Sequence, residues 1–549
     1  MFDLVIRGAL LVDGSGAEPR RGDLAVSGGR IADMGSISAA ARETIDAGGL
    51  ALMPGIIDNH THYDAQITWD PGVSPSSKLG VTTAVIGNCG FTIAPCRRAD
   101  RELVMRNLTQ VEGMSIDVLR QGIRWDFETL PEYLDMLERQ GCALNIAVFA
   151  GHSALRTYVM GADAARRAAT ETEVRAMKAL LAEALHAGAI GFSTSTSPAH
   201  NGEGGLPMPS RLADEAEMRA LVATLGEAGR GVFMLTKGGH TEVRFLEELA
   251  ALSKRPVVIA ALLHNSTNPE SVFQDLEAIS AANARGRRLV GAVSCCPLSM
   301  DFTLRSPYTF EGLQAWQPAL ALKGRDYERK LADKAFRDAV REEIERPAHF
   351  RLFNGEWDKV QVIESARAEA EQRSIADLAR ASGKDPLDFM LDLALEEGLQ
   401  TVFSALLLNS DETAVGRMLR HPASLVSLSD AGAHLTFFND AGFGLHLLGH
   451  WVRERGVLTL AEAVRRLTRD PATVFGIRGR GELKRGYHAD LLLFDPARVD
   501  RGPKQRVFDL PGGHPRLTTP AIGVEAVWVN GVRLEEELRP GHLLRDFSA

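Results

Sequence analysis

Short apolar segments alternate with long segments of helical pattern from about residue 54 to residue 470, and this alternation constrains the fold most. VTTAVIG at 81–87 and LNIAVFAG at 144–151 are apolar throughout, whereas residues 163–188 have a helical pattern. Such strands are typical of a parallel sheet covered by helices on both faces. About eight candidate strands predict an α/β fold with a closed TIM-like (β/α)8 barrel. A doubly wound open sheet is the alternative, but no candidate strand precedes a GxGxxG turn.

The later candidate strands complete this set. They are AIGFSTS at 189–195, GVFMLTKG at 231–238, PVVIAALLH at 256–264, RRLVGAVS at 287–294, TVFSALLLN at 401–409 and SLVSLSDAG at 424–432. The chain ends differ from this region, because residues 2–50 and 488–534 contain short β segments, with Asn530-Gly531 as a hairpin signal. We therefore expect a catalytic barrel and a small β domain built from both termini. The predicted boundaries are 1–53, 54–470 and 471–549.

Charge and cysteine usage exclude several classes of protein. The net charge of -9 is mild for 549 residues, and the Lys and Arg residues form no basic block, so nucleic-acid binding is not expected. The first residues, MFDLVIRGALLVDG, lack the basic region and long apolar stretch of a secretory signal, so none is expected, and no apolar run approaches about 18 residues. Five cysteines in a long chain do not form a disulfide framework. We expect a cytoplasmic protein without membrane contact, acting on a small molecule as a homo-oligomer.

His60 and His62 follow a short apolar run in PGIIDNHTHYDAQ, where they form a His-x-His pair. Side chains two positions apart on a strand share one face, so both imidazoles can converge on one ion. Neutral imidazole is a common ligand of zinc and similar ions. A structural or surface role is the alternative, but the position just beyond a predicted strand favours a metal site.

PGIIDNHTHYDAQ resembles the first-strand signature of the amidohydrolase superfamily, and VTTAVIGNCG at 81–90 resembles its D-aminoacylase (N-acyl-D-amino-acid deacylase) branch. The resemblance covers nearly the whole chain, including GHSALR at 151–156 and SDAGAH at 429–434. It implies a distorted TIM barrel flanked by a β-sandwich from both termini. It also implies a zinc cofactor of one or two ions, for which another divalent transition metal is an alternative.

The resemblance also implies roles for three further residues. Cys89 in GNCG corresponds to a metal-binding cysteine, although a buried free cysteine is the alternative. Asp430 corresponds to the catalytic carboxylate that touches the metal and takes a proton from the attacking water, although it also suits a turn. His264 corresponds to the sixth-strand histidine ligand, with a core residue as the alternative.

The fifth strand departs from the family pattern, because Thr236 and Lys237 occupy the place of the expected histidine. Lys237 is open to three roles: a carboxylated bridging lysine, a cation that stabilises an oxyanion, or a plain surface residue. His240 follows three residues later in a glycine-rich loop. A zinc site normally needs three protein ligands and an open position. The absence of the fifth-strand histidine therefore weakens the case for a two-metal centre.

The lysine and tyrosine that hold the substrate carboxylate in the classical deacylases are also not evident. Arg156 is a candidate replacement, because a guanidinium group grips a carboxylate bidentately, and a surface salt bridge is its alternative role. His152 and His434 are further candidates for substrate contact or support, with plain loop roles as the alternatives.

We predict a metal-dependent hydrolase that cleaves the amide C–N bond of an N-acyl compound, with metal-activated water and Asp430 as general base and acid. The same apparatus suits a cyclic amide, lactone or carbamate, and the sequence does not separate these substrates. A catalytically inactive binding protein on the same scaffold is a third hypothesis, motivated by the missing fifth-strand histidine.

Overall fold

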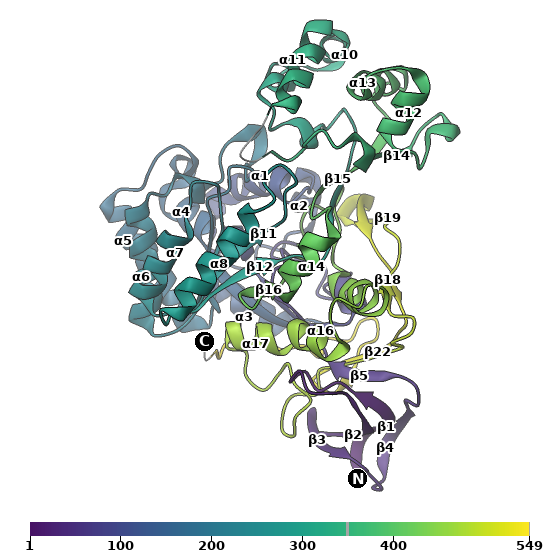
Figure 1. The fold of residues 1–549 in the computed structure, drawn as a ribbon. Coiled ribbons are helices and arrows are strands. Elements are labelled where there is room, and N and C mark those ends of the chain that lie inside the picture. The colour runs from purple at the N-terminus through teal and green to yellow at the C-terminus, as the bar shows by residue number, and fades with distance from the viewer. Residues whose placement is uncertain (347–350, 548–549) are drawn as a thin grey trace.

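The computed structural model describes residues 1–346 and 351–547, and its centre is a curled sheet of eight parallel strands (Figure 1). In chain order these are β6 (Ile56–Asp58), β7 (Val81–Ile86), β8 (Asn145–Gly151), β9 (Gly191–Ser195), β10 (Val232–Thr236), β11 (Val257–Leu262), β12 (Leu289–Val293) and β16 (Ser424–Val426). The sheet order is β16-β12-β11-β10-β9-β8-β7-β6. The segments after the two edge strands meet, because Thr61 pairs with Ala431 and His62 N donates to Ala431 O at 2.7 Å.

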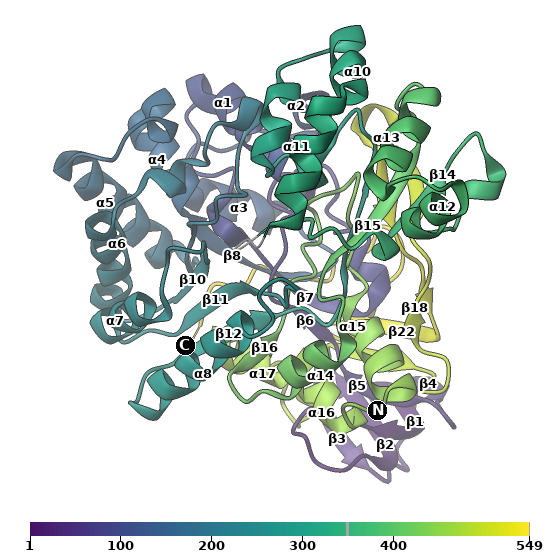
Figure 2. The same ribbon diagram turned by 45° about the horizontal axis from the view of Figure 1, so that its top comes forward.

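Helices cover the outside of this sheet (Figures 1 and 2). They are α1 (Arg101–Val111), α2 (Ile116–Gly122), α3 (Leu130–Gln140), α4 (His152–Met160), α5 (Glu171–Ala187), α6 (Glu215–Ala228), α7 (Val243–Ser253), α8 (Ser271–Ala284), α14 (Glu412–Arg420), α15 (Phe443–His446), α16 (Leu460–Leu467) and α17 (Arg469–Phe475). The sequence fixes the ends of many of them. At α5, Thr170 and Glu173 form a capping box, and Gly188 ends the helix in a left-handed conformation.

Both chain ends form one further sheet, which lies at the bottom of Figure 1. It contains β1 (Phe2–Leu11), β2 (Arg20–Ser27), β3 (Arg30–Gly35), β4 (Ala41–Asp46), β5 (Ala51–Pro54), β17 (Leu491–Phe494), β22 (Val524–Val529) and β23 (Val532–Arg533). Two ribbons, β18 (Asp500–Arg501) with β21 (Ala521–Ile522) and β19 (Gln505–Leu510) with β20 (His514–Thr518), complete the C-terminal part. The predicted fold class is confirmed, whereas the exact domain boundaries stay a prediction.

A long insertion separates β12 from β16 and lies at the top of Figure 1. It contains β13 (Leu298–Phe302), β14 (Val360–Glu364), β15 (Val402–Leu408), α9 (Gln317–Leu320), α10 (Gly324–Ala332), α11 (Lys334–Glu345), α12 (Ile375–Ser382) and α13 (Pro386–Glu396). The insertion has its own apolar core around Phe310, Trp316 and Phe403.

The assignment of TVFSALLLN to the barrel is therefore wrong. The segment forms β15, the middle strand of the antiparallel sheet β13-β15-β14. Its burial largely alternates along the strand, whereas every residue of β7 is buried. A run of apolar letters does not distinguish these two settings, because one-sided burial of a strand tolerates apolar residues on its outer face.

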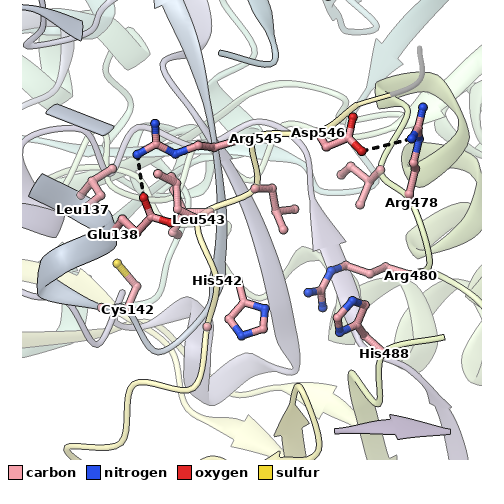
Figure 3. A pocket seen from close by; sticks show the side chains of 15 residues that line it. Leu137, Glu138, Cys142, Arg478, Arg480, His488, His542, Leu543, Arg545 and Asp546 are labelled. Atoms are coloured by element: carbon pink, nitrogen blue, oxygen red, sulfur yellow. Dashed lines mark hydrogen bonds and ion pairs between the residues drawn. The ribbon is translucent and has the colours of Figure 1, made fainter. Parts of the chain in front are cut away.

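A cavity of about 430 Å³ lies between α3 and the C-terminal segment, beside Ile146 near the start of β8 (Figure 3). Its arginines are already paired, since Arg478 contacts Asp546 at 3.1 Å and Arg545 contacts Glu138 at 2.8 Å. Because the cavity lies near the start of β8, it is remote from the carboxyl ends of the strands, where the active sites of α/β barrels lie. Among the described residues, no helix has both the length and the apolar character needed to cross a membrane.

Candidate metal centre

Four predicted site residues converge at the carboxyl ends of β6, β7 and β16. Nε2 of His60 lies 3.4 Å from the Cys89 sulfur and 3.2 Å from Asp430 Oδ1. Nε2 of His62 lies 3.9 Å from the Cys89 sulfur and 3.7 Å from Asp430 Oδ1. Two imidazole nitrogens, a thiol sulfur and a carboxylate oxygen therefore face one point, and we call these four residues the donor cluster.

Turns with a left-handed backbone place two members of the donor cluster. Cys89 has φ 58° in the turn after β7, and Asp430 has φ 46° after β16. Such a conformation is unfavourable for residues other than glycine and costs about 1–3 kcal/mol, so it persists only where the surroundings fix it. Gly90 fits beside Cys89 because a Cβ atom there would approach Ser193 O at 3.1 Å. Both turns aim their side chains into the barrel mouth.

Burial and mutual charge set the electrostatics of the cluster. Burial lowers the pKa of His60 to about 4 and raises the pKa of the Cys89 thiol. Burial opposes ionisation of Asp430, but its interactions with the imidazoles of His62, His60 and His434 outweigh this, so its pKa lies below its usual value. Asp430 is therefore an ionised carboxylate at neutral pH.

Glu112 is a site residue that the sequence interpretation missed. It follows α1 directly, and its Oε1 lies 3.4 Å from His62 Nδ1, on the opposite side of the ring from the donor cluster. Burial raises the pKa of this carboxyl to about 8 in the metal-free chain, although the charge of His62 acts against the rise. No motif in the surrounding sequence QVEGMS signals this contact, which depends on the packing of α1 against the barrel mouth.

A small cavity of about 60 Å³ opens on the donor cluster. Besides the cluster and Glu112, its lining consists of Phe91, His200, Thr236, Ala261, Leu428 and His434. Thr236 Oγ1 lies 3.1 Å from the Cys89 sulfur, so Thr236 and not Lys237 is the residue that β10 directs inward. Burial lowers the pKa of His200 to about 3 and that of His434 to about 4, so both rings are neutral at neutral pH.

The structure does not bring His264 to the donor cluster. Its backbone N–H donates to Asn409 Oδ1 at 2.7 Å. The charged groups that act on its ring are Asp411, Glu356, Lys359 and Glu270. Strand β11 ends at Leu262 and presents Ala261 to the cavity, so His264 lies beyond the strand end, beside the insertion. The sequence spacing alone did not reveal where the strand stops.

Two residues of the fifth-strand loop also lie away from the cluster. Lys237 Nζ contacts Asp275 Oδ2 of α8 at 3.1 Å, which directs the side chain outward. His240 is exposed and lines a separate surface depression with Phe245. Neither side chain lines the cavity at the cluster.

His152 and Arg156 instead form a second buried group, with Glu217 of α6. His152 Nε2 lies 2.8 Å from Glu217 Oε1, and its Nδ1 lies 2.8 Å from Thr194 Oγ1. Arg156 pairs with the other oxygen of Glu217 and donates to Arg167 O at 2.7 Å. Because Arg156 is fully buried and engaged in this way, its guanidinium group has no access to a substrate carboxylate.

The chain is similar to known proteins over nearly its whole length. The profile described as Amidohydrolase family matches residues 43–534. D-aminoacylase from Alcaligenes xylosoxydans xylosoxydans is 30% identical over 98% of this chain and 95% of its own, and N-acyl-D-aspartate deacylase from the same organism is 30% identical over 98% and 93%. The crystal structure of N-acyl-D-glutamate deacylase from Bordetella bronchiseptica, complexed with zinc and a phosphonate inhibitor, has a TM-score of 0.68 at 26% identity, covering 99% of this chain and 100% of that one. This chain therefore belongs to the amidohydrolase family and is a hydrolase that acts on carbon–nitrogen bonds other than peptide bonds.

Proposed function

We propose that this protein removes the acyl group from an N-acyl amino acid or a closely related N-acyl compound, with one zinc ion as cofactor. Relatives of nearly full length include an aminoacylase and two deacylases of N-acyl-D-amino acids. The phosphonate in the related zinc complex mimics the tetrahedral intermediate of that enzyme's reaction. These likenesses support the reaction class, and the donor cluster supports the cofactor.

The observation that carries the proposal is the spacing of the four donor atoms. The ligand atoms of a tetrahedral zinc site with bonds of about 2.0–2.3 Å lie about 3.3–3.8 Å apart. Four of the six distances between the donor atoms of the cluster run from 3.2 to 3.9 Å, and the ligand atoms of His60, His62 and Cys89 all lie within 4.8 Å of one another. Imidazole, thiolate and carboxylate are also the ligand types that zinc prefers. The residues present therefore fit the ion.

A single ion suits this chain better than two. The ends of β10 and β11 present Thr236 and Ala261 to the cavity, and neither side chain is a strong zinc ligand. Within residues 1–346 and 351–547, the only described group of His, Cys, Asp or Glu with metal-ligand spacing is His60, His62 and Cys89. One related structure of D-aminoacylase is described as having a binuclear centre. We infer that this chain holds only one ion.

Zinc, when bound, polarises a carbonyl oxygen and lowers the pKa of water. Asp430 takes a proton from the attacking water and returns it to the leaving nitrogen, because its side chain lines the cavity and is ionised at neutral pH. His200 and His434 flank the same space as neutral rings, and Ser195 fixes the His200 ring through a 2.7 Å hydrogen bond to Nδ1. Both histidines are therefore placed to form hydrogen bonds with the substrate.

The lining of the cavity favours a second candidate substrate. Among the described residues that line it, none is a lysine or an arginine, so a carboxylate next to the reacting carbonyl would lack a cationic partner. A neutral cyclic amide or lactone has no such need. We retain these compounds as the alternative substrate class.

The test is a screen of purified protein against N-acyl-D-amino acids, N-acyl-L-amino acids, neutral cyclic amides and lactones, with metal measured on the same sample. We expect about one zinc per chain and turnover of an N-acyl-amino acid. Turnover of neutral compounds alone would identify cyclic amides or lactones as the substrates. A zinc-loaded protein with no activity on any class would contradict both.

We also propose a cytoplasmic location and a homo-oligomeric state. All five cysteines are free and buried, which suits a reducing compartment. Fractionation of the native cell and the mass of the purified protein in solution test these two points separately.

A further inference from the structure

Glu112 carries a carboxyl group in an unusual setting. Its side chain is 4% exposed, and the ring of His62 is equally buried. Among the described residues, Glu112 Oε2 has no hydrogen-bond partner, and no Lys or Arg forms an ion pair with this carboxyl. Ionisation of a buried carboxyl group is costly unless a positive group lies beside it, and His62 is the group that forms an ion pair with Glu112.

The two nitrogens of His62 face different partners. Nε2 faces Cys89 and Asp430, whereas Nδ1 lies 3.4 Å from Glu112 Oε1, beyond a well-formed hydrogen bond. A neutral imidazole carries one proton, and a lone pair on Nε2 requires that proton on Nδ1. The Glu112 carboxylate is an acceptor for an Nδ1 proton, so the geometry favours the tautomer that offers Nε2 to a cation.

The backbone around Glu112 is firmly held, which gives the contact a fixed geometry. Glu112 N donates to Leu108 O at 2.9 Å, and Leu435 N donates to Glu112 O at 3.3 Å. Gly113 follows with φ +62°, and a Cβ atom there would lie 2.9 Å from the Phe437 ring and 3.2 Å from His434 Cα. The turn that carries Glu112 therefore packs against the loop that carries Asp430.

We propose that Glu112 is a positioning residue that holds the proton of His62 on Nδ1, orients the ring and strengthens Nε2 as a cation ligand. Carboxylates that accept the second N–H of a metal-binding histidine typically change metal affinity by about 10–100-fold. The effect on cation affinity rests on the proposed function. The position of the ring proton in metal-free protein with a neutral His62 does not depend on it.

The experiment compares Glu112→Met, Glu112→Gln and the wild-type chain by zinc titration against a competing chelator. We expect Glu112→Met to bind zinc about 10–100-fold more weakly. Glu112→Gln keeps an oxygen that accepts the Nδ1 proton but loses the charge, so we expect a smaller loss of affinity. Glu217→Gln is the matched control, because it alters a buried glutamate that contacts a histidine away from the cluster. Its zinc affinity stays at the wild-type value.

A second readout uses 15N–1H correlation of the histidine rings in metal-free protein, at a pH where His62 is neutral. This pH must be raised, because burial lowers the pKa of His62 but the Glu112 carboxylate opposes this and holds it above its usual value. We expect the proton of His62 on Nδ1 in the wild type and in Glu112→Gln, and a shift toward Nε2 in Glu112→Met. Unchanged zinc affinity together with an unchanged tautomer in a folded Glu112→Met variant overturns the proposal. If the wild-type chain binds no zinc, the proposed cofactor fails, and the tautomer alone then decides the role of Glu112.

Discussion

Two buried groups near the carboxyl ends of the barrel strands contain a histidine beside a carboxyl group, and they differ in how their charges and hydrogen bonds are satisfied. In the group of His152, Arg156 and Glu217, both ring nitrogens of His152 have hydrogen-bond partners at 2.8 Å. Arg156 balances the charge of Glu217 within the group. In the donor cluster, His60, His62, Cys89 and Asp430 instead direct their ligand atoms at one another around one point.

The difference separates a structural group from a binding site. The charges of the first group are balanced without a ligand, because Arg156 pairs with Glu217 inside the protein. The donor cluster gathers electron-pair donors, and such an arrangement is stabilised when a cation is bound. The cluster also has access to a cavity, whereas Arg156 and His152 are fully buried. The following variants test this contrast, in order of decreasing expected effect.

The largest effect is expected for His60→Ala. The variant removes one of the four convergent donor atoms and leaves a space beside Cys89 and Asp430. We expect loss of bound zinc and turnover below detection, because the metal supplies the electrophile. Metal content by atomic absorption and a rate assay on the same sample check this. Retention of zinc at the wild-type level would show that the cluster is not the metal site.

Asp430→Asn is expected to separate binding from chemistry. The amide keeps an oxygen near His60 Nε2 but no longer accepts a proton from water. We expect most of the zinc to remain bound while turnover falls by about 10²–10⁴-fold. Undiminished hydrolysis by the zinc-loaded variant would remove Asp430 from the mechanism.

Arg156→Met tests the other group. The substitution leaves the Glu217 carboxylate buried without its cation, and breaking a buried pair in this way costs about 3–5 kcal/mol. We expect the free energy of unfolding to fall by about that amount in urea titrations, with zinc affinity unchanged. A variant of full stability that no longer turns over substrate would instead place Arg156 in the active site.

Much of the fold follows from sequence because barrel strands and capped helices leave local patterns. The seven strands from β6 to β12 lie within the predicted apolar segments, and β16 lies in SLVSLSDAG. The insertion could not be predicted from the sequence, because the apolar segment of β15 resembles a barrel strand. Its one-sided burial depends on partners β13 and β14, which are distant in sequence.

The site could be predicted only where its residues lie in sequence motifs at strand ends. His60, His62, Cys89 and Asp430 lie at strand ends within motifs, and the structure brings them together, although their roles as ligands stay predictions until metal is measured. Glu112 lies in no motif, and its contact depends on how α1 packs. His264 resembled a strand-end ligand, but two residues beyond Leu262 the backbone has already turned toward the insertion.

The smallest effect is expected for Lys237→Met, which decides among the three roles considered for this lysine. Lys237 pairs with Asp275 at 3.1 Å near the surface, and such pairs contribute about 0–1 kcal/mol. We expect turnover and zinc content equal to those of the wild type, with stability lower by about 1 kcal/mol or less. Asp275→Asn serves as the matched control, since it breaks the same pair from the other side. A loss of turnover in Lys237→Met but not in Asp275→Asn would mean that the lysine acts on the substrate or a metal. Lys237 would then belong to the active site together with the donor cluster.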